Sequence, residues 1–216
     1  GRILSDVITY GTEDGHYDDL EEIPLYRRAD DLLFWAEGTV RWNTPTYNSS
    51  TKSYTAVHKQ NPYSRYSYYF VTEGDSPILM EDLDIAAEAT KQVVTTFPEH
   101  SLIDPEEYSW YTSGRNLYES YNYGESAGSR TYNLPAPDAD TTQGASLYIN
   151  FSAYNQVGST QVIVKGNGVQ LGQYTIRKSD QYDHAVSGQR TWAMQGLLQN
   201  NKINITVAEG VDARLD

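Results

Sequence analysis

The sequence predicts an all-β protein with two β-rich units, of which the C-terminal one is a jelly-roll-like β-sandwich. Three observations support this prediction. Short apolar or alternating segments recur every 8–12 residues or so, with Gly, Asn and Asp turns between them. Only one segment has a helix-favouring composition. Residues 1–108 carry 20 acidic and 8 basic side chains, whereas residues 109–216 carry 9 and 8, which indicates two units with different surfaces.

The N-terminal unit has two strand signals and one ambiguous segment. Residues 32–36 form a short apolar run between an Asp-Asp pair and a glycine. Residues 66–72 are rich in the aromatic and β-branched side chains that favour strands. Residues 80–94 contain the Ala and Glu of a helix, but their apolar positions fit a 3.6-residue period poorly. We expect an irregular crossover there that enters a strand from about Lys91.

The C-terminal unit has clearer strand patterns. Within residues 146–153, the side chains of Leu147, Ile149 and Phe151 fall on one face of a strand, because side chains alternate with period two. Residues 203–207 alternate in the same way. Strands of this kind, polar on one face only, predict a sandwich core between two sheets.

A hairpin is predicted at the centre of this unit. Residues 161–165 lead into Gly-Asn-Gly at 166–168, a strong two-residue turn signal. In residues 169–176 the apolar positions are odd at first and even later, which predicts a β-bulge near the glycine of that strand.

The unit boundary is predicted at residues 97–105, which have the weakest strand signal. We therefore expect an acidic β-domain at 1–98 and a β-sandwich at 99–216. Gly1 is interpreted as the remnant of a cleaved tag. Residues 213–216 begin a strand with no turn after it, so we expect an expressed fragment in which the sandwich is truncated at its last strand.

Composition excludes several classes of function. The chain has no cysteine, which removes thiol nucleophiles, disulfides and Cys-ligated metals. A net charge of −13 argues against nucleic acid as a partner, because phosphate backbones need a Lys/Arg surplus. No apolar run approaches the roughly 20 residues of a membrane-spanning helix. The GxSxG, GxxxxGK[ST] and GxGxxG motifs do not occur.

The acidic stretch from Glu13 to Glu22 is the one candidate cation site. It holds six carboxylates in ten residues, and calcium is bound by oxygen ligands. The EF-hand spacing is missing, so the expected interpretation is a solvated loop, with calcium binding and a metal-dependent hydrolase as alternatives. No other cofactor is expected. The histidines lie far apart and form no HxH or HxxxH pair: His16, His58, His100 and His184.

The 19 tyrosines and 4 tryptophans gather before residue 75 and again at residues 108–123. Exposed aromatic rings stack on sugars or anchor protein partners. Buried rings fill cores that are poor in aliphatic side chains. We expect them to fill the cores of both units, and a carbohydrate-binding β-sandwich module of a surface protein is the alternative function.

Three motifs in one order carry a family resemblance. They are Asp14-Gly15-x-Tyr17 with residues 30–38 and Trp42, then residues 58–70 (HKQNPYSRYSYYF), then residues 113–119 (SGRNLYE). From about Tyr10 to Leu215, the chain resembles the region upstream of the peptidase domain in PorU-like sortases of the type IX secretion system of Bacteroidetes. These sortases are gingipain-type cysteine peptidases.

The chain departs from the family pattern at two positions of the third motif. Leu117 stands where the family usually has an aromatic residue, and Glu119-Ser120 replaces Gly-Glu. The catalytic His and Cys of the family lie downstream of the matched region. The resemblance therefore implies no catalytic, cofactor-binding or metal-binding residue here. Arg115 and Glu119 are the candidate inter-domain contact, since arginine forms bidentate bonds with carboxylates and the first unit is acidic.

The function that the resemblance implies is that of a noncatalytic N-terminal scaffold or interaction region. It would belong to a secreted or cell-surface, outer-membrane-associated gingipain/PorU-like cysteine peptidase. The implied partners are the downstream peptidase domain of the same parent chain and proteins of the secretion system or cell surface. For this fragment alone we expect no enzymatic activity.

Overall fold

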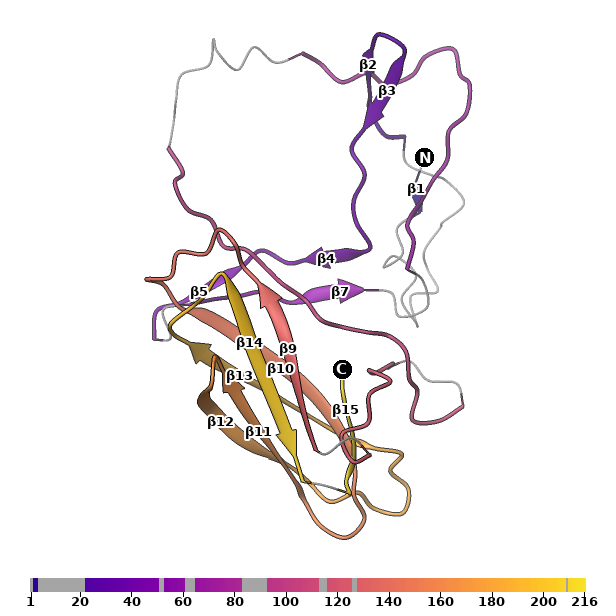
Figure 1. Ribbon diagram of the computed structural model, residues 1–216. Coiled ribbons are helices and arrows are strands. Elements are labelled where there is room, and N and C mark those ends of the chain that lie inside the picture. Colours follow the sequence, from indigo (N-terminus) through magenta and orange to yellow (C-terminus); the bar gives the residue numbers. More distant parts are fainter. Residues whose placement is uncertain are drawn as a thin grey trace. The chain divides into compact units, whose positions relative to one another are not determined.

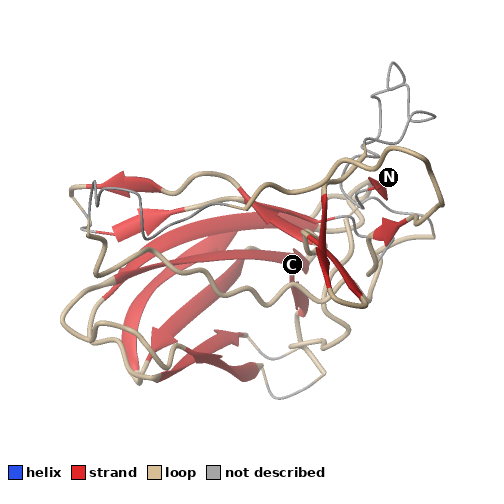
Figure 2. Ribbon diagram, turned by 90° about the horizontal axis from the view of Figure 1, so that it is seen from above, coloured by secondary structure: helices blue, strands red, loops and turns tan. Residues whose placement is uncertain are grey.

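The computed structural model describes residues 2–3, 22–50, 53–60, 65–82, 93–112, 116–125, 128–208 and 210–216. These residues form strands and loops without a helix (Figure 2), so the predicted all-β class is confirmed. The strands are β1 (Arg2–Ile3), β2 (Leu25–Arg28), β3 (Asp31–Phe34), β4 (Val40–Trp42), β5 (Thr46–Asn48), β6 (Ser53–Thr55), β7 (His58–Gln60), β8 (Tyr68–Tyr69), β9 (Ser129–Pro135), β10 (Ala145–Tyr154), β11 (Thr160–Gly166), β12 (Val169–Ile176), β13 (Val186–Met194), β14 (Asn200–Val207) and β15 (Asp212–Leu215).

The chain divides into two compact units. One comprises residues 1–44 and 57–98, and the other comprises residues 45–56 and 99–216. The second unit therefore includes the β5–β6 hairpin, which comes from the first half of the sequence.

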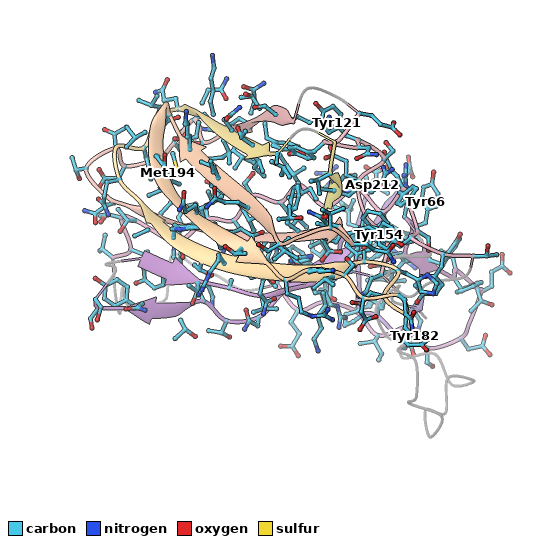
Figure 3. All side chains as sticks on the ribbon, turned by 90° about the horizontal axis from the view of Figure 1, so that it is seen from below. Tyr66, Tyr121, Tyr154, Tyr182, Met194 and Asp212 are labelled. Atoms are coloured by element: carbon cyan, nitrogen blue, oxygen red, sulfur yellow. The ribbon has the colours of Figure 1, made fainter. Side chains whose placement is uncertain are left out.

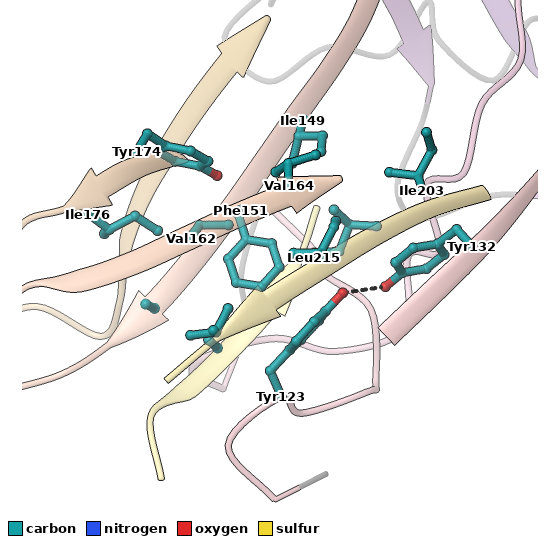
Figure 4. Close-up of a cluster of buried hydrophobic side chains, with 14 of the residues drawn as sticks. Tyr123, Tyr132, Ile149, Phe151, Val162, Val164, Tyr174, Ile176, Ile203 and Leu215 are labelled. Atoms are coloured by element: carbon teal, nitrogen blue, oxygen red, sulfur yellow. Dashed lines mark hydrogen bonds between the residues drawn. The ribbon is translucent and has the colours of Figure 1, made fainter. Parts of the chain in front are cut away.

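The second unit is a β-sandwich of two antiparallel sheets (Figure 1). One sheet has the order β12-β11-β14-β9 and the other has the order β13-β10-β15. Their facing side chains form one core, and Figure 4 shows the rings and aliphatic side chains that fill it. Phe151, Val162 and Val164 are completely buried there.

The central strand β10 has the predicted alternation. Ile149 and Phe151 are buried in the core and Leu147 packs against it, whereas Tyr148 on the opposite face is half exposed. Strand β14 repeats the pattern, with Ile203 and Ile205 buried. Both strands are thus held in register by the hydrophobic pattern of one face.

The predicted hairpin and its bulge are both present. Strands β11 and β12 are joined by Asn167 and Gly168, whose φ angles are +49° and +84°. Two consecutive positive φ angles are typical of a type I′ turn, which matches the twist of the strands. The register shifts so that Val164 pairs with Gly172 and Lys165 with Gln170. Leu171 is therefore the extra residue of a β-bulge.

The first unit contains short two-stranded sheets, β1–β8, β2–β3 and β4–β7. None of its described side chains is buried. Leu32, Phe34 and Trp35 are exposed, the last to 72%. The prediction that aromatic residues fill the cores of both units is therefore wrong for the described part of this unit, because paired short strands supply no second layer to cover them.

Two further predictions for this unit need correction. The strand expected over residues 66–72 is limited to Tyr68–Tyr69, and residues 93–97 form no strand. In both segments aromatic and β-branched composition favours a strand, but a strand also needs a hydrogen-bonded neighbour. The acidic residues 13–21 and most of the ambiguous segment, residues 83–92, lie outside the described residues.

Candidate functional site: a buried arginine and carboxylate cluster

The third sequence motif continues into a segment that runs alongside the last strand. The backbone N–H of Glu119 donates to the carbonyl of Leu215 at 2.8 Å, and that of Tyr123 donates to Ala213 at 3.0 Å. Tyr108 and Tyr118 form an antiparallel bridge earlier in the same segment. These bonds cover the edge of β15 that does not pair with β10. Figure 3 labels Tyr121, which lies between the two donors in the sequence, and Asp212, the first residue of β15.

Glu119 is the buried carboxylate of the cluster. Its side chain is only 5% exposed, and its Oε1 lies 2.5 Å from Nη1 of Arg130. The hydroxyl of Tyr132 donates a short hydrogen bond to Oε2. The hydroxyls of Tyr132 and Tyr123 are 3.0 Å apart (Figure 4). Both carboxylate oxygens are therefore engaged by side chains of the same unit.

Burial dominates the electrostatics of these groups. It raises the pKa of Glu119, while the hydrogen bond from Tyr132 and the charge of Arg130 act in the opposite direction. Burial also raises the pKa values of Tyr123 and Tyr132. Each shift has the sign expected when a low-dielectric environment disfavours the charged form.

Arg130 joins the cluster from strand β9. Its guanidinium carbon lies 4.5 Å from the ring centre of Tyr121 and 5.1 Å from that of Tyr132. A planar guanidinium binds a carboxylate and stacks on aromatic rings at the same time. The alternation of β9 explains its position, since Arg130 and Tyr132 point toward the same side of the strand.

Arg214 is the second arginine of the cluster and, unlike Arg130, it is buried, with 7% exposure. Its guanidinium carbon lies 3.5 Å from the ring centre of Tyr108 and 5.6 Å from that of Trp110. Nη1 donates to the carbonyl of Ser120 at 2.5 Å and to that of Glu119 at 3.4 Å. Within the described residues its Nε makes no hydrogen bond. Arg214 therefore ties strand β15 to the third motif mainly through carbonyls and aromatic rings.

The described residues of the segment 108–112 and 116–123, called the motif segment below, place aromatic side chains on part of the outer face of the three-stranded sheet. The indole N–H of Trp110 donates to Oγ of Ser152 at 2.9 Å. The hydroxyls of Tyr118 and Ser187 are 3.3 Å apart, and Ser152 and Ser187 are paired in the β10–β13 register. The sheet is thus packed on its inner face by the core and, around Ser152 and Ser187, on its outer face by this segment.

The cluster has the composition of a structural network. Its carboxylate and guanidinium groups are bound by side chains and carbonyls from three separate segments, 108–123, β9 and β15. Buried charges persist in proteins when they are paired and hydrogen-bonded in this way. Among the described residues, no group of three or more His, Asp or Glu side chains is arranged to hold a metal ion.

The structure describes one of the two predicted contact residues. Glu119 lies at the centre of the cluster and pairs with Arg130 of its own unit. Arg115 lies outside the described residues, so its role stays a prediction. Sequence reasoning missed Arg130 and Arg214. The sequence pattern could have revealed both. Arg130 alternates with Tyr132 and Leu134 on one face of β9, and Arg214 lies between the apolar residues Ala213 and Leu215.

Comparison with known proteins shows a likeness to a solved structure. No family model and no curated protein matches the chain. Among solved structures, the whole chain superposes on part of the crystal structure of dimeric latent PorU from Porphyromonas gingivalis, with a TM-score of 0.69 and 20% sequence identity. The fold is PorU-like. The match covers 100% of this chain and 20% of the PorU chain, so the chain spans about one fifth of that protein's length.

Proposed function

We propose that this chain is a noncatalytic scaffold and interaction region of a larger gingipain/PorU-like cysteine peptidase. One observation carries the proposal: the whole chain has the fold of one part of PorU, and that part is a fifth of the PorU chain. The absence of cysteine from the sequence is consistent with it, because a cysteine peptidase needs a thiolate nucleophile.

The two units support different parts of this role. In the second unit, the Glu119–Arg130 ion pair and the bonds from Arg214 to the carbonyls of Glu119 and Ser120 hold the motif segment on the sandwich, as suits a rigid support. In the first unit, exposed side chains such as Trp35 and Val71 provide the apolar surface that contact regions present to a neighbouring protein. We propose the downstream peptidase domain of the same parent chain as that neighbour, and secretion-system or surface proteins as further partners.

We place the parent protein in the type IX secretion pathway, secreted or at the cell surface in association with the outer membrane. This location rests on the family resemblance. In the part of the chain that the structure describes, no helix has the length and apolar character needed to cross a membrane. The acidic charge of the chain gives no support to a nucleic-acid partner.

The carbohydrate-binding alternative has weaker support. Sugar platforms need flat, exposed rings, but the ring pairs Phe34–Tyr69 and Tyr47–Tyr54 are tilted by 47° and 53°. Tyr111 and His184 are nearly parallel at 4.6 Å, so each ring occupies one face of the other.

The proposal is tested by comparing three proteins: residues 1–216 alone, the parent chain, and the parent chain without residues 1–216. We expect residues 1–216 to cleave no peptide, and the parent gene to encode a His and Cys pair after Asp216. We expect the shortened parent to lose folding yield or activity. Peptide cleavage by residues 1–216 alone, or a reading frame that ends near Asp216, would overturn the proposal.

A further inference from the structure

The turn between β11 and β12 contains the only Asn-Gly pair of the sequence, Asn167-Gly168. An asparagine followed by glycine is chemically labile, because the glycine N–H has no neighbouring side chain to shield its approach to the asparagine amide. The structure shows that this side chain has an unusually complete set of hydrogen bonds.

The Asn167 amide joins the turn to the β13–β14 loop and to the first residues of β14. Its Nδ2 donates to the carbonyl of Gly196 at 3.2 Å and to Oδ1 of Asn201 at 3.0 Å. Its Oδ1 accepts from the backbone N–H of Lys202 at 2.9 Å. Its own N–H donates to the Lys202 carbonyl at 2.8 Å. The partners fix the orientation of the amide, since one side offers acceptors and the other offers a donor.

Asn201 makes this arrangement hard to replace. It is 5% exposed, and its Oδ1 also accepts from the N–H of Leu198 at 2.9 Å. Its Nδ2 donates to the carbonyls of Leu198 at 2.7 Å and Leu134 at 3.5 Å. If the Asn201 amide rotated to offer a donor toward Asn167, both Leu198 bonds would be lost. A change at Asn167 is therefore not compensated by its neighbour.

We propose that Asn167-Gly168 is a deamidation site that the folded hairpin suppresses, and whose modification releases the β13–β14 loop at residues 195–199. In the reaction, the backbone nitrogen of Gly168 loses its proton and bonds to Cγ of Asn167. The Cγ–Nδ2 bond breaks and ammonia leaves. Water then opens the resulting five-membered imide, yielding aspartate or isoaspartate. Water is the only co-reactant.

The fold opposes this reaction in two ways. The positive φ angles identify a type I′ turn, and ring closure requires the torsion about the Asn167 Cα–C bond to leave the value that this turn imposes. The amide must also release Gly196, Asn201 and Lys202 before Cγ can rotate toward Gly168. Deamidation thus requires local opening of the hairpin. Its rate in the folded protein is the rate of the open state multiplied by the fraction of molecules that are open.

The product would disrupt the loop in a specific way. An aspartate keeps the acceptor that faces Lys202 but loses both donors, so its second oxygen faces the carbonyl of Gly196 and Oδ1 of Asn201. Acceptors placed against one another without a proton repel, and the buried Asn201 oxygen loses one of its partners. Isoaspartate additionally lengthens the backbone within the turn.

The rate is tested on the 216-residue chain in neutral buffer and in urea, with peptide mass spectrometry at Asn167. We expect modification in urea to be faster by at least about tenfold, equivalent to an opening free energy of about 1.4 kcal/mol. Asn48-Ser49 in the β5–β6 turn is the internal reference. In urea, Gly168→Ala should slow the reaction at Asn167 and leave Asn48 unchanged. Equal rates of deamidation at Asn167 in buffer and in urea would show that the folded hairpin does not suppress the reaction.

The structural consequence is tested with Asn167→Asp and Asn167→Gly. Glycine keeps the turn and removes the side-chain hydrogen bonds. Asn167→Gly therefore measures the effect of losing these bonds without the added negative charge. We expect both variants to speed amide hydrogen exchange at Leu198, Asn167→Asp more than Asn167→Gly, whereas exchange at Lys202 should speed up in Asn167→Gly, which removes its acceptor. If exchange at Leu198 is unchanged in Asn167→Asp, the amide does not hold the loop and the proposal is wrong.

Discussion

The guanidinium of Arg214 lies 3.5 Å from the ring centre of Tyr108, although more than 100 residues of sequence separate them. This contact places strand β15 against the beginning of the 99–216 part of the second unit. Carbonyls of Glu119 and Ser120 accept hydrogen bonds from the same guanidinium. A single side chain therefore links β15, the motif segment and an aromatic pair.

Replacing Arg214 should destabilise the second unit. In Arg214→Met, the carbonyl of Ser120 loses a charge-assisted hydrogen bond and Tyr108 loses its stacked cation, at a cost of about 2–4 kcal/mol. Urea unfolding followed by tryptophan fluorescence measures this, since Trp110 lies beside the site. Arg177→Met is the matched control. The salt bridge of Arg177 with Asp183 is at the surface, so its loss should change the free energy of unfolding very little. Equal midpoints for the two variants would contradict the structural role of Arg214.

The buried Glu119 predicts a specific pH dependence. Because burial raises its pKa, the folded protein keeps the proton at a pH where the unfolded chain, with a pKa of about 4.3, has lost it. The contribution of Glu119 to stability is therefore fully present below the unfolded pKa and is lost as pH rises through the folded one. Glu119→Gln copies the protonated form at every pH. The free energy of unfolding of wild type relative to this variant should therefore fall as pH rises from about 4 to about 7. A relative free energy that grows with pH would mean that attraction to Arg130 outweighs burial.

Alkaline titration should separate buried from exposed tyrosines. Burial raises the pKa values of Tyr123, Tyr132 and Tyr174 above the usual value. The stability that these residues contribute is complete below an unfolded pKa of about 10 and falls as pH rises above it. Tyrosinate absorbance should therefore rise in two phases, with the second coinciding with loss of circular dichroism. Tyr123→Phe should reduce the second phase. A single phase with no unfolding would show that these hydroxyls titrate freely.

Local patterns in the sequence predicted the sandwich strands well. Alternation alone identified the buried face of β10, and the Asn-Gly turn and its bulge followed from the positive φ that glycine and asparagine tolerate. These features depend on neighbours within a few residues. The outcome was poorer at residues 66–72, where strand-favouring composition was not matched by a pairing partner.

The cluster around Glu119 could be predicted only in part. The motif drew attention to Glu119, but its partners Arg130 and Tyr132 come from β9, and Arg214 comes from the end of the chain. Pairings across such distances are set by sheet topology, which a single sequence does not specify. The same reason explains the β5–β6 hairpin, whose place in the second unit has no local signal.

Close backbone approach at Gly124 gives a final prediction. A Cβ at this position would lie 2.3 Å from the carbonyl oxygen of Val211 and 2.6 Å from its carbon. Because these are backbone atoms next to β15, they cannot move aside without disturbing the contact between that strand and the motif segment. Gly124→Ala should therefore cost about 1–3 kcal/mol, the usual range for overpacking. Gly158→Ala is the matched control, since its Cβ would meet nothing within 4 Å, and its stability should change by no more than about 0.5 kcal/mol. Urea midpoints measure both variants. If Gly124→Ala is as stable as Gly158→Ala, the motif segment does not pack against residues 211–212 as tightly as described, and the link between Arg214 and the carbonyls of residues 119 and 120 would need the same revision.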